Sequence, residues 1–162
     1  MDLEAEIKQI IDDAPKYGVP TEVMEQAVVP VLKLFAQRLQ HQEYQVIQTL
    51  NGDWVLTTLE SRVQPEIAKT VVYAFATLKD AASFPGAKDP KLMAMPLSSI
   101  QVLFQLFAIE RLDSIIFLET PGDLSTGRQI DRADLQSSIV ERVQLLNQAN
   151  RMTNDRIPPN LA

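Results

Sequence analysis

The sequence has no cysteine and one histidine, His41, among its 162 residues. Without cysteine the chain can form no disulfide, present no thiolate nucleophile and supply no sulfur ligand to a metal. A single histidine also excludes a metal site built from several histidines of this chain. No loop shows the closely spaced oxygen ligands of a hard-cation site. We therefore predict no metal site and no cofactor, and we can name no catalytic residue.

Basic charge is scarce too. Fifteen lysines and arginines stand against twenty-one aspartates and glutamates, which gives a formal net charge of −6 and an isoelectric point near 4.8. Nucleic acids and anionic lipid surfaces attract basic proteins, so this charge balance argues against both as partners.

Long hydrophobic runs are also missing. The densest run, residues 100–109, is interrupted by Gln101 and Gln105 and is shorter than the ~20 residues that span a bilayer. The first six residues are acidic, whereas a secretory signal begins with positive charge. We expect a cytoplasmic protein without membrane insertion.

Hydrophobic residues make up 46% of the chain, which is enough for a core in one domain. The helical spacing of apolar residues predicts a first helix over residues 3–14, ended by Pro15. A second helix follows over residues 21–39, with Thr21 as its N-cap. Pro30 should kink this second helix, because proline lacks a backbone donor and crowds the preceding turn.

The middle of the chain favours strands. Residues 44–50 and 54–59 flank Asn51-Gly52, which is typical of a two-residue type I′ hairpin turn. In that register Trp54 lies opposite Thr49, and Ile47 lies opposite Leu56. Residues 65–82 fit either a helix or a strand; we favour a strand over residues 70–77 and a helical turn over residues 79–84.

The remaining segments complete the order of elements. They are a short edge strand at residues 91–95 before Pro96, a helix to about residue 110, a buried strand at residues 114–119 and a last helix from about residue 131. We predict an α+β fold: a mostly antiparallel sheet of 4–5 strands with two N-terminal helices, one central helix and one C-terminal helix. Residues 1–148 would form the single domain, and residues 149–162 a flexible tail.

No segment carries a complete catalytic or nucleotide motif. Residues 122–129 resemble a phosphate-binding loop, but Arg128 and Gln129 stand where that motif has Lys and Ser or Thr. An ordinary loop is the simpler interpretation. Fourteen glutamines solvate the surface or, in the sharper interpretation, form a neutral polar interface for a partner. The sequence does not decide whether the protein is an enzyme, but the lack of a complete catalytic motif favours a non-enzymatic protein.

The central helix is apolar nearly all round, which is typical of a helix that is buried or faces a partner. The leading hypothesis is a non-enzymatic protein-interaction module, meaning an adaptor, assembly factor or small chaperone. Its predicted contact residues are Val102, Leu106 and Ile109. The stripe of Leu135, Ile139, Val143 and Leu146 on the last helix suggests a homodimer.

The alternative is a small-ligand sensor or enzyme with a pocket between the sheet and the kinked second helix. Tyr44, Trp54 and Tyr73 are the residues that could line this pocket. A cavity with a few convergent polar groups would favour this alternative, and a packed interior would contradict it.

Residues 95–107, MPLSSIQVLFQLF, and residues 113–119, DSIIFLE, resemble an uncharacterised family of cyanobacterial proteins. The resemblance covers about residues 95–119 and implies a cytoplasmic or thylakoid-associated protein without assigned catalytic residues. The order of elements also looks like that of small type III secretion chaperones, which clasp other proteins as dimers. That likeness concerns topology and says little about function.

Overall fold

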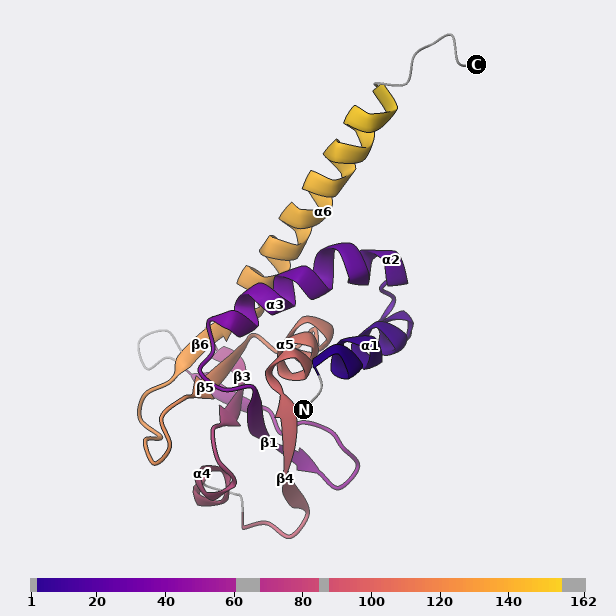
Figure 1. Ribbon diagram of the computed structural model, residues 1–162. Helices are drawn as coiled ribbons and strands as arrows, with labels where there is room; N and C mark the ends of the chain where they lie inside the picture. The colour runs from indigo at the N-terminus through magenta and orange to yellow at the C-terminus, as the bar shows by residue number, and fades with distance from the viewer. Residues whose placement is uncertain (1–2, 61–67, 85–87, 156–162) are drawn as a thin grey trace.

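The computed structural model describes residues 3–60, 68–84 and 88–155, which form an α+β fold around an open, mostly antiparallel sheet (Figure 1). The helices are α1 (Leu3–Asp13), α2 (Thr21–Val23), α3 (Val29–Gln37), α4 (Leu78–Ser83), α5 (Ser99–Ala108) and α6 (Arg132–Asp155). The strands are β1 (Glu43–Thr49), β2 (Thr57–Glu60), β3 (Ala68–Phe75), β4 (Leu92–Ser98), β5 (Ser114–Leu118) and β6 (Arg128–Asp131). The predicted fold class is confirmed, with one strand more than expected.

The strands follow the order β4-β1-β3-β5-β6, and β2 pairs with the first half of β3. One pair, β3 with β5, is parallel, and the other described pairs are antiparallel. The helix α5 makes the crossover that a parallel pair requires, because it carries the chain back to the start of the next strand. The strand predicted at residues 70–77 is confirmed over residues 70–75, as part of β3, while residues 65–67 of the alternative helix lie outside the described residues.

The predicted hairpin differs from the structure in its register. Gln48 pairs with Trp54, so the arms are shifted by one residue from the expected pairing of Thr49 with Trp54. Gly52 alone has a positive φ, of 88°, in this turn, whereas a type I′ turn needs two such residues. A shift of one residue moves Trp54 to the other face of the sheet. After Val55 the second arm leaves β1 and pairs with β3 instead.

The second helix is continuous with a π-helical turn at Met24–Val28 between α2 and α3. In a regular α-helix the Gln26 carbonyl would accept a hydrogen bond from residue 30, which is proline and has no N–H. Arg142 of α6 supplies the missing donor, with its Nε 3.3 Å from that carbonyl oxygen. The predicted distortion at Pro30 is thus a π turn. Thr21 is not the N-cap; Pro20 holds that position without a side-chain hydrogen bond.

The two faces of the sheet are covered unequally. The helices α1, α3, α5 and α6 pack on one face, which we call the helical face, and α4 lies on the other side (Figure 1). Side chains of Tyr44, Val46, Ala74 and Phe117 point into the continuous core under these helices. A smaller cluster of Ile47, Phe75, Ala81 and Leu118 lies on the second face.

Helix α6 is longer than predicted and extends away from the body of the molecule (Figure 1). It continues through Asp155, so residues 149–155 of the predicted tail are helical, and residues 156–162 lie outside the described residues. No helix in the described part of the chain is both long and apolar enough to cross a membrane.

Candidate binding groove

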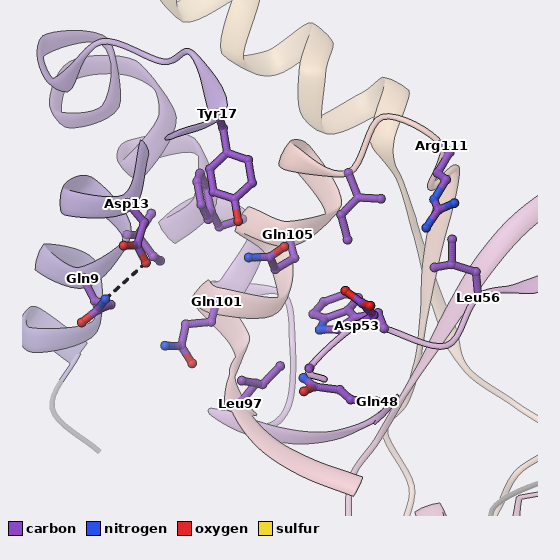
Figure 2. Close-up of a pocket in the computed structure, with 15 residues that line it drawn as sticks. Gln9, Asp13, Tyr17, Gln48, Asp53, Leu56, Leu97, Gln101, Gln105 and Arg111 are labelled. Atoms are coloured by element: carbon purple, nitrogen blue, oxygen red, sulfur yellow. Dashed lines mark hydrogen bonds between the residues drawn. The ribbon is translucent and has the colours of Figure 1, made fainter. Parts of the chain in front are cut away.

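A groove of about 440 Å³ lies on the helical face between α1, α5 and the hairpin that follows β1 (Figure 2). Its position follows from the hairpin register, because the shift turns Trp54 toward the helices, onto the face where Gln48 lies. The second arm of the hairpin diverges from β1 after Val55, and this leaves the space between the arm and α5 unfilled. The groove therefore lies beside the hairpin, whose register differs from the one that the sequence predicted.

The floor of this groove carries the amide of Gln48. The residue is 9% exposed and lines the groove, and its amide has no hydrogen-bond partner among the described residues. The amide atoms remain accessible to water in the groove, because they are not among the buried unpaired polar atoms of the described residues. The half-buried Trp54 lies beside Gln48, and its indole N–H is likewise unpaired within the described chain. A ligand in the groove can therefore replace water at both groups.

One wall of the groove comes from α5. Gln101 completes the N-terminal capping box of that helix: its backbone N–H donates to Ser98 Oγ at 3.1 Å, and its side-chain oxygen accepts from the Ser98 N–H at 3.3 Å. Gln105, one turn further on, directs its amide into the groove (Figure 2) and has no partner among the described residues. The side-chain oxygen of Gln101 is thus used to cap α5, whereas the amide of Gln105 is available to a ligand.

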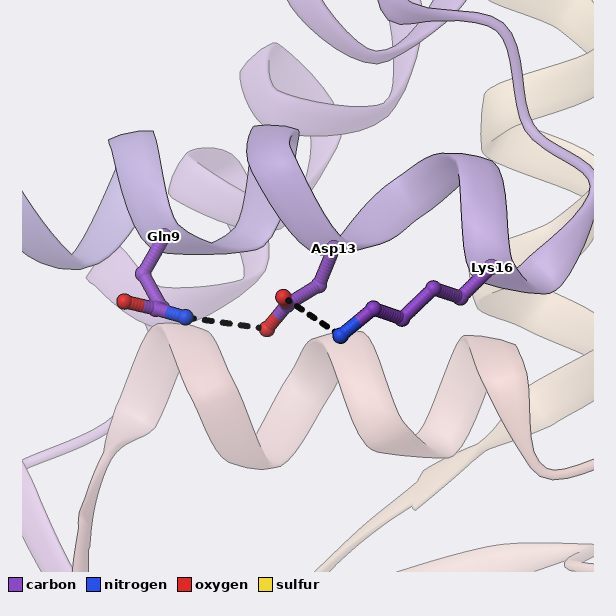
Figure 3. Close-up of polar contacts among 3 residues, drawn as sticks. All are labelled: Gln9, Asp13 and Lys16. Atoms are coloured by element: carbon purple, nitrogen blue, oxygen red, sulfur yellow. Dashed lines mark hydrogen bonds and ion pairs between the residues drawn. The ribbon is translucent and has the colours of Figure 1, made fainter.

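The opposite wall comes from α1 and the turn that follows it. The Asp13 carboxylate accepts a hydrogen bond from Gln9 Nε2 at 3.2 Å and pairs with Lys16 Nζ at 3.6 Å (Figure 3). The negative charge of Asp13 on this wall is therefore already paired with Lys16. Tyr17 is 47% exposed and packs edge-on against Phe104, with ring centroids 5.6 Å apart, so its hydroxyl stays at the groove rim.

Two charged side chains complete the lining. Asp53 on the hairpin and Arg111, just before β5, are both exposed and form no ion pair with each other. The groove therefore combines amides, an indole, a phenol, a carboxylate and a guanidinium from separate segments. These groups recognise a polar molecule with both donors and acceptors.

The three aromatic residues predicted to share a pocket do not do so. Trp54 lines the groove, Tyr73 lies on the second face in an apolar pocket of about 130 Å³, and Tyr44 is fully buried. A separate groove of about 450 Å³ does lie beside α3, but the segment at residues 39–42 and the first turn of α5 form its other walls. None of the three aromatics lines it.

The contact residues predicted on the central helix are placed differently as well. Val102 and Leu106 are fully buried in the main core, so they cannot form an exposed docking face. The helix is apolar all round because the sheet covers one side and other helices cover the rest. Ile109 is half-buried and lines the groove.

The homodimer predicted through the last helix stays a prediction. Leu135 and Ile139, the first two residues of its stripe, are buried against the body of this chain. The exposed Val140 and Leu145 lie about 140° apart around the helix at 3.6 residues per turn, so they do not form one face. Val143 and Leu146 are half-buried.

A second polar cluster joins distant parts of the chain. Glu119 is 7% exposed; one carboxylate oxygen accepts from the Tyr44 hydroxyl, and the other accepts from the Gln40 backbone N–H at 2.7 Å. His41 Nε2 lies 2.7 Å from the Glu119 carbonyl oxygen. Burial and the hydrogen bond to Glu119 raise the pKa of the Tyr44 hydroxyl well above its ordinary value. The cluster ties β5 to the connection between α3 and β1.

No protein-family model matches the chain, and no curated protein matches it in sequence. The resemblance to cyanobacterial proteins therefore stays a prediction. No group of three or more His, Cys, Asp or Glu side chains in the described ranges is arranged to hold a metal ion.

The sequence patterns did not single out Gln48, although it forms the floor of the groove. Alternate residues of a strand point to the same face, and this parity sets Gln48 with Tyr44 and Val46, the most buried residues of β1. No sequence pattern indicated that Arg111 would line a binding site.

Proposed function

We propose that the protein is a non-enzymatic interaction module that holds an extended, polar segment of a partner protein in the groove between α1, α5 and the hairpin. The observation that carries this proposal is the amide of Gln48, which lines the groove beside Trp54 and has no hydrogen-bond partner among the described residues. An amide side chain offers one acceptor and one donor group, which match the C=O and N–H groups of a peptide backbone. Gln105 supplies a second such pair on the adjacent wall.

The free edge of β4 supports the groove as the place where such a segment binds. Ser99 N–H donates to the Gln42 carbonyl at 2.9 Å, and hydrogen bonding alternates along an antiparallel pair. Residues 94 and 96 of β4 therefore face the free edge, and Pro96 has no N–H to offer. The outward N–H of Ser98 donates to Gln101. This edge is poorly suited to receive an added strand.

The charges in the groove indicate the character of the segment. Asp53 and Arg111 bring one charge of each sign, neither of them ion-paired with a described residue, so a segment with both an acidic and a basic side chain would complement them. Both residues are exposed, so these charges contribute to orientation and association rate more than to affinity. Most of the affinity would come from the floor, where water is displaced from Gln48 and Trp54.

The test selects nine-residue peptides from a random displayed library on the wild-type protein and synthesises the enriched sequences. Trp54 is the sole tryptophan of the sequence, so its intrinsic fluorescence reports binding in the groove without a label. Gln48→Leu should weaken the selected peptides about tenfold, the loss expected for one or two hydrogen bonds. Gln45→Leu is the matched control, because Gln45 lies on the same strand but faces away from the groove.

Two outcomes contradict the proposal. The first is that no peptide is enriched on the wild-type protein. The second is that enriched peptides bind both variants as tightly as they bind the wild type, which would place them elsewhere on the surface. A neutral sugar or amino acid that shifts Trp54 fluorescence when no peptide does would favour the small-ligand alternative.

A further inference from the structure

A cavity of about 350 Å³ lies at the other end of the helical face, between the end of α3, the start of β6 and the first turns of α6. Two arginines line it: Arg38 follows α3, and Arg128 is the first residue of β6. The hydroxyl-bearing side chains of Ser137 and Ser138 reach the same cavity from α6. In a chain with a net charge of −6, this is a local concentration of positive charge and donor groups.

Neither guanidinium group hydrogen-bonds or ion-pairs with another described residue. Within the described ranges the one ion pair joins Lys16 to Asp13, and neither arginine of the cavity donates a hydrogen bond there. The guanidinium carbon of Arg38 lies 4.8 Å from the centroid of the Phe35 ring. Stacking on an aromatic face orients a guanidinium while its N–H groups remain available.

We infer that this cavity binds a phosphate monoester group. Two guanidinium forks and two hydroxyls present mainly donors, and arginine matches the oxygens of a tetrahedral oxyanion in bidentate geometry. Asp134 also lines the cavity, and its carboxylate opposes an anion. The lining therefore keeps a net charge of +1, and the affinity should fall steeply with ionic strength because the arginines are exposed.

The contacts differ from those of a phosphate-binding loop. Arg128 stands where that motif has lysine, but in the structure it begins a strand and not a helix. The backbone N–H groups that such a loop would offer are replaced here by side-chain donors from three elements. The cavity is separate from the groove of the proposed function, so either proposal can fail without the other.

The test titrates the wild-type protein with inorganic phosphate and, separately, with O-phosphoserine at low ionic strength, followed by amide chemical shifts. We expect saturable shifts around Ser137 and Ser138. Arg38→Gln and Arg128→Gln should each weaken binding about tenfold, the effect of losing a charge-assisted hydrogen bond. Asp134→Asn should tighten binding roughly threefold by removing like charge.

Lys79→Gln, at an exposed position of α4, removes the same net charge outside the cavity and is the control; it should leave the phosphate affinity unchanged. Arg128→Lys keeps the charge but loses the fork, so it should recover part of the affinity. Tighter binding of O-phosphoserine than of phosphate would support a phosphate monoester as the ligand, whereas equal or weaker binding would identify free phosphate and overturn the monoester. Shifts that never saturate, or that are equal in all variants, mean an adventitious ion only and overturn the inference.

Discussion

The two faces of the sheet are built from the same strands but are covered very differently. On the helical face, alternate residues of β1, β3 and β5 are fully buried under α1, α3, α5 and α6. On the second face, the cluster around Ile47, Phe75 and Leu118 is covered mainly by α4, which has six residues. Tyr73, Phe84 and Ile116 remain half-buried there.

Folding stability and ligand recognition therefore depend on different parts of the molecule. The apolar cluster on the thinly covered face is small, and the pocket there is lined mainly by apolar side chains. The polar groups of the two proposed sites lie instead at the two ends of the helical face, with Gln48 and Trp54 at one end and Arg128 at the other. A rigid core between them holds each set of donors in place, which reduces the entropy lost on binding.

The largest expected effect tests whether the helical face carries the stability. Phe117 is fully buried on that face, in edge contact with Tyr44 at 4.9 Å between ring centroids. Phe117→Ala should lower the free energy of unfolding by about 3–5 kcal/mol. Phe84→Ala, on the second face, should cost about 1–2 kcal/mol, because that ring is already partly exposed in the folded protein.

Urea unfolding at constant m-value measures both variants. Equal losses would show that the second face is as important to folding as the helical face, and would break the contrast. A loss for Phe84→Ala above that of Phe117→Ala would reverse it.

The next effect concerns the polar cluster that closes the helical face. Tyr44→Phe removes the hydroxyl that donates to Glu119 and leaves one oxygen of a buried carboxylate without its donor. We expect a loss of about 1–3 kcal/mol in the free energy of unfolding at pH 7. Tyr73→Phe on the second face is the matched control, since no described residue hydrogen-bonds to that hydroxyl, and it should unfold as the wild type does.

The same tyrosine predicts a dependence on pH. Its pKa in the folded protein lies above its ordinary value of 10.0, so the unfolded chain loses this proton first as the pH rises. Its contribution to stability is therefore fully present below pH 10 and declines as the pH rises above 10 toward the folded pKa. Unfolding midpoints between pH 8 and about 11 should fall more steeply for the wild type than for Tyr44→Phe. Parallel curves would contradict this assignment.

Much of the fold followed from sequence patterns, because most elements are decided by local periodicity. The strand at residues 70–77, the helical turn after it and the strand at residues 114–119 all rest on residues whose burial matches their spacing. β6 was missed because Arg128–Asp131 has one apolar residue, Ile130. Its place in the sheet comes from pairing with β5, which no local pattern encodes.

The site was harder to predict for a related reason. Whether Trp54 faces the helices depends on a one-residue difference in the hairpin register, and Asn51-Gly52 is compatible with more than one turn. Val102 and Leu106 were assigned to a partner because the amount of covering structure around α5 cannot be read from that helix alone. Burial is a property of the assembled layers, whereas apolar character is a property of the segment.

The smallest expected effect tests the cover of the second face. Asp80 is 6% exposed, and both of its carboxylate oxygens lie 3.1 Å from the Gly122 backbone nitrogen, so it joins α4 to the turn after β5. Asp80→Asn replaces one acceptor with a donor and should cost about 1 kcal/mol. Because the second face carries little of the core, this loss should be local: amide exchange should accelerate at Gly122 and in α4 but not in α5.

Asp89→Asn, in an exposed turn where the carboxylate accepts from Lys91 N–H at 2.9 Å, is the control. Faster exchange throughout both faces would mean that α4 and the helical core unfold as one unit, and the two faces would then differ in cover but not in cooperativity.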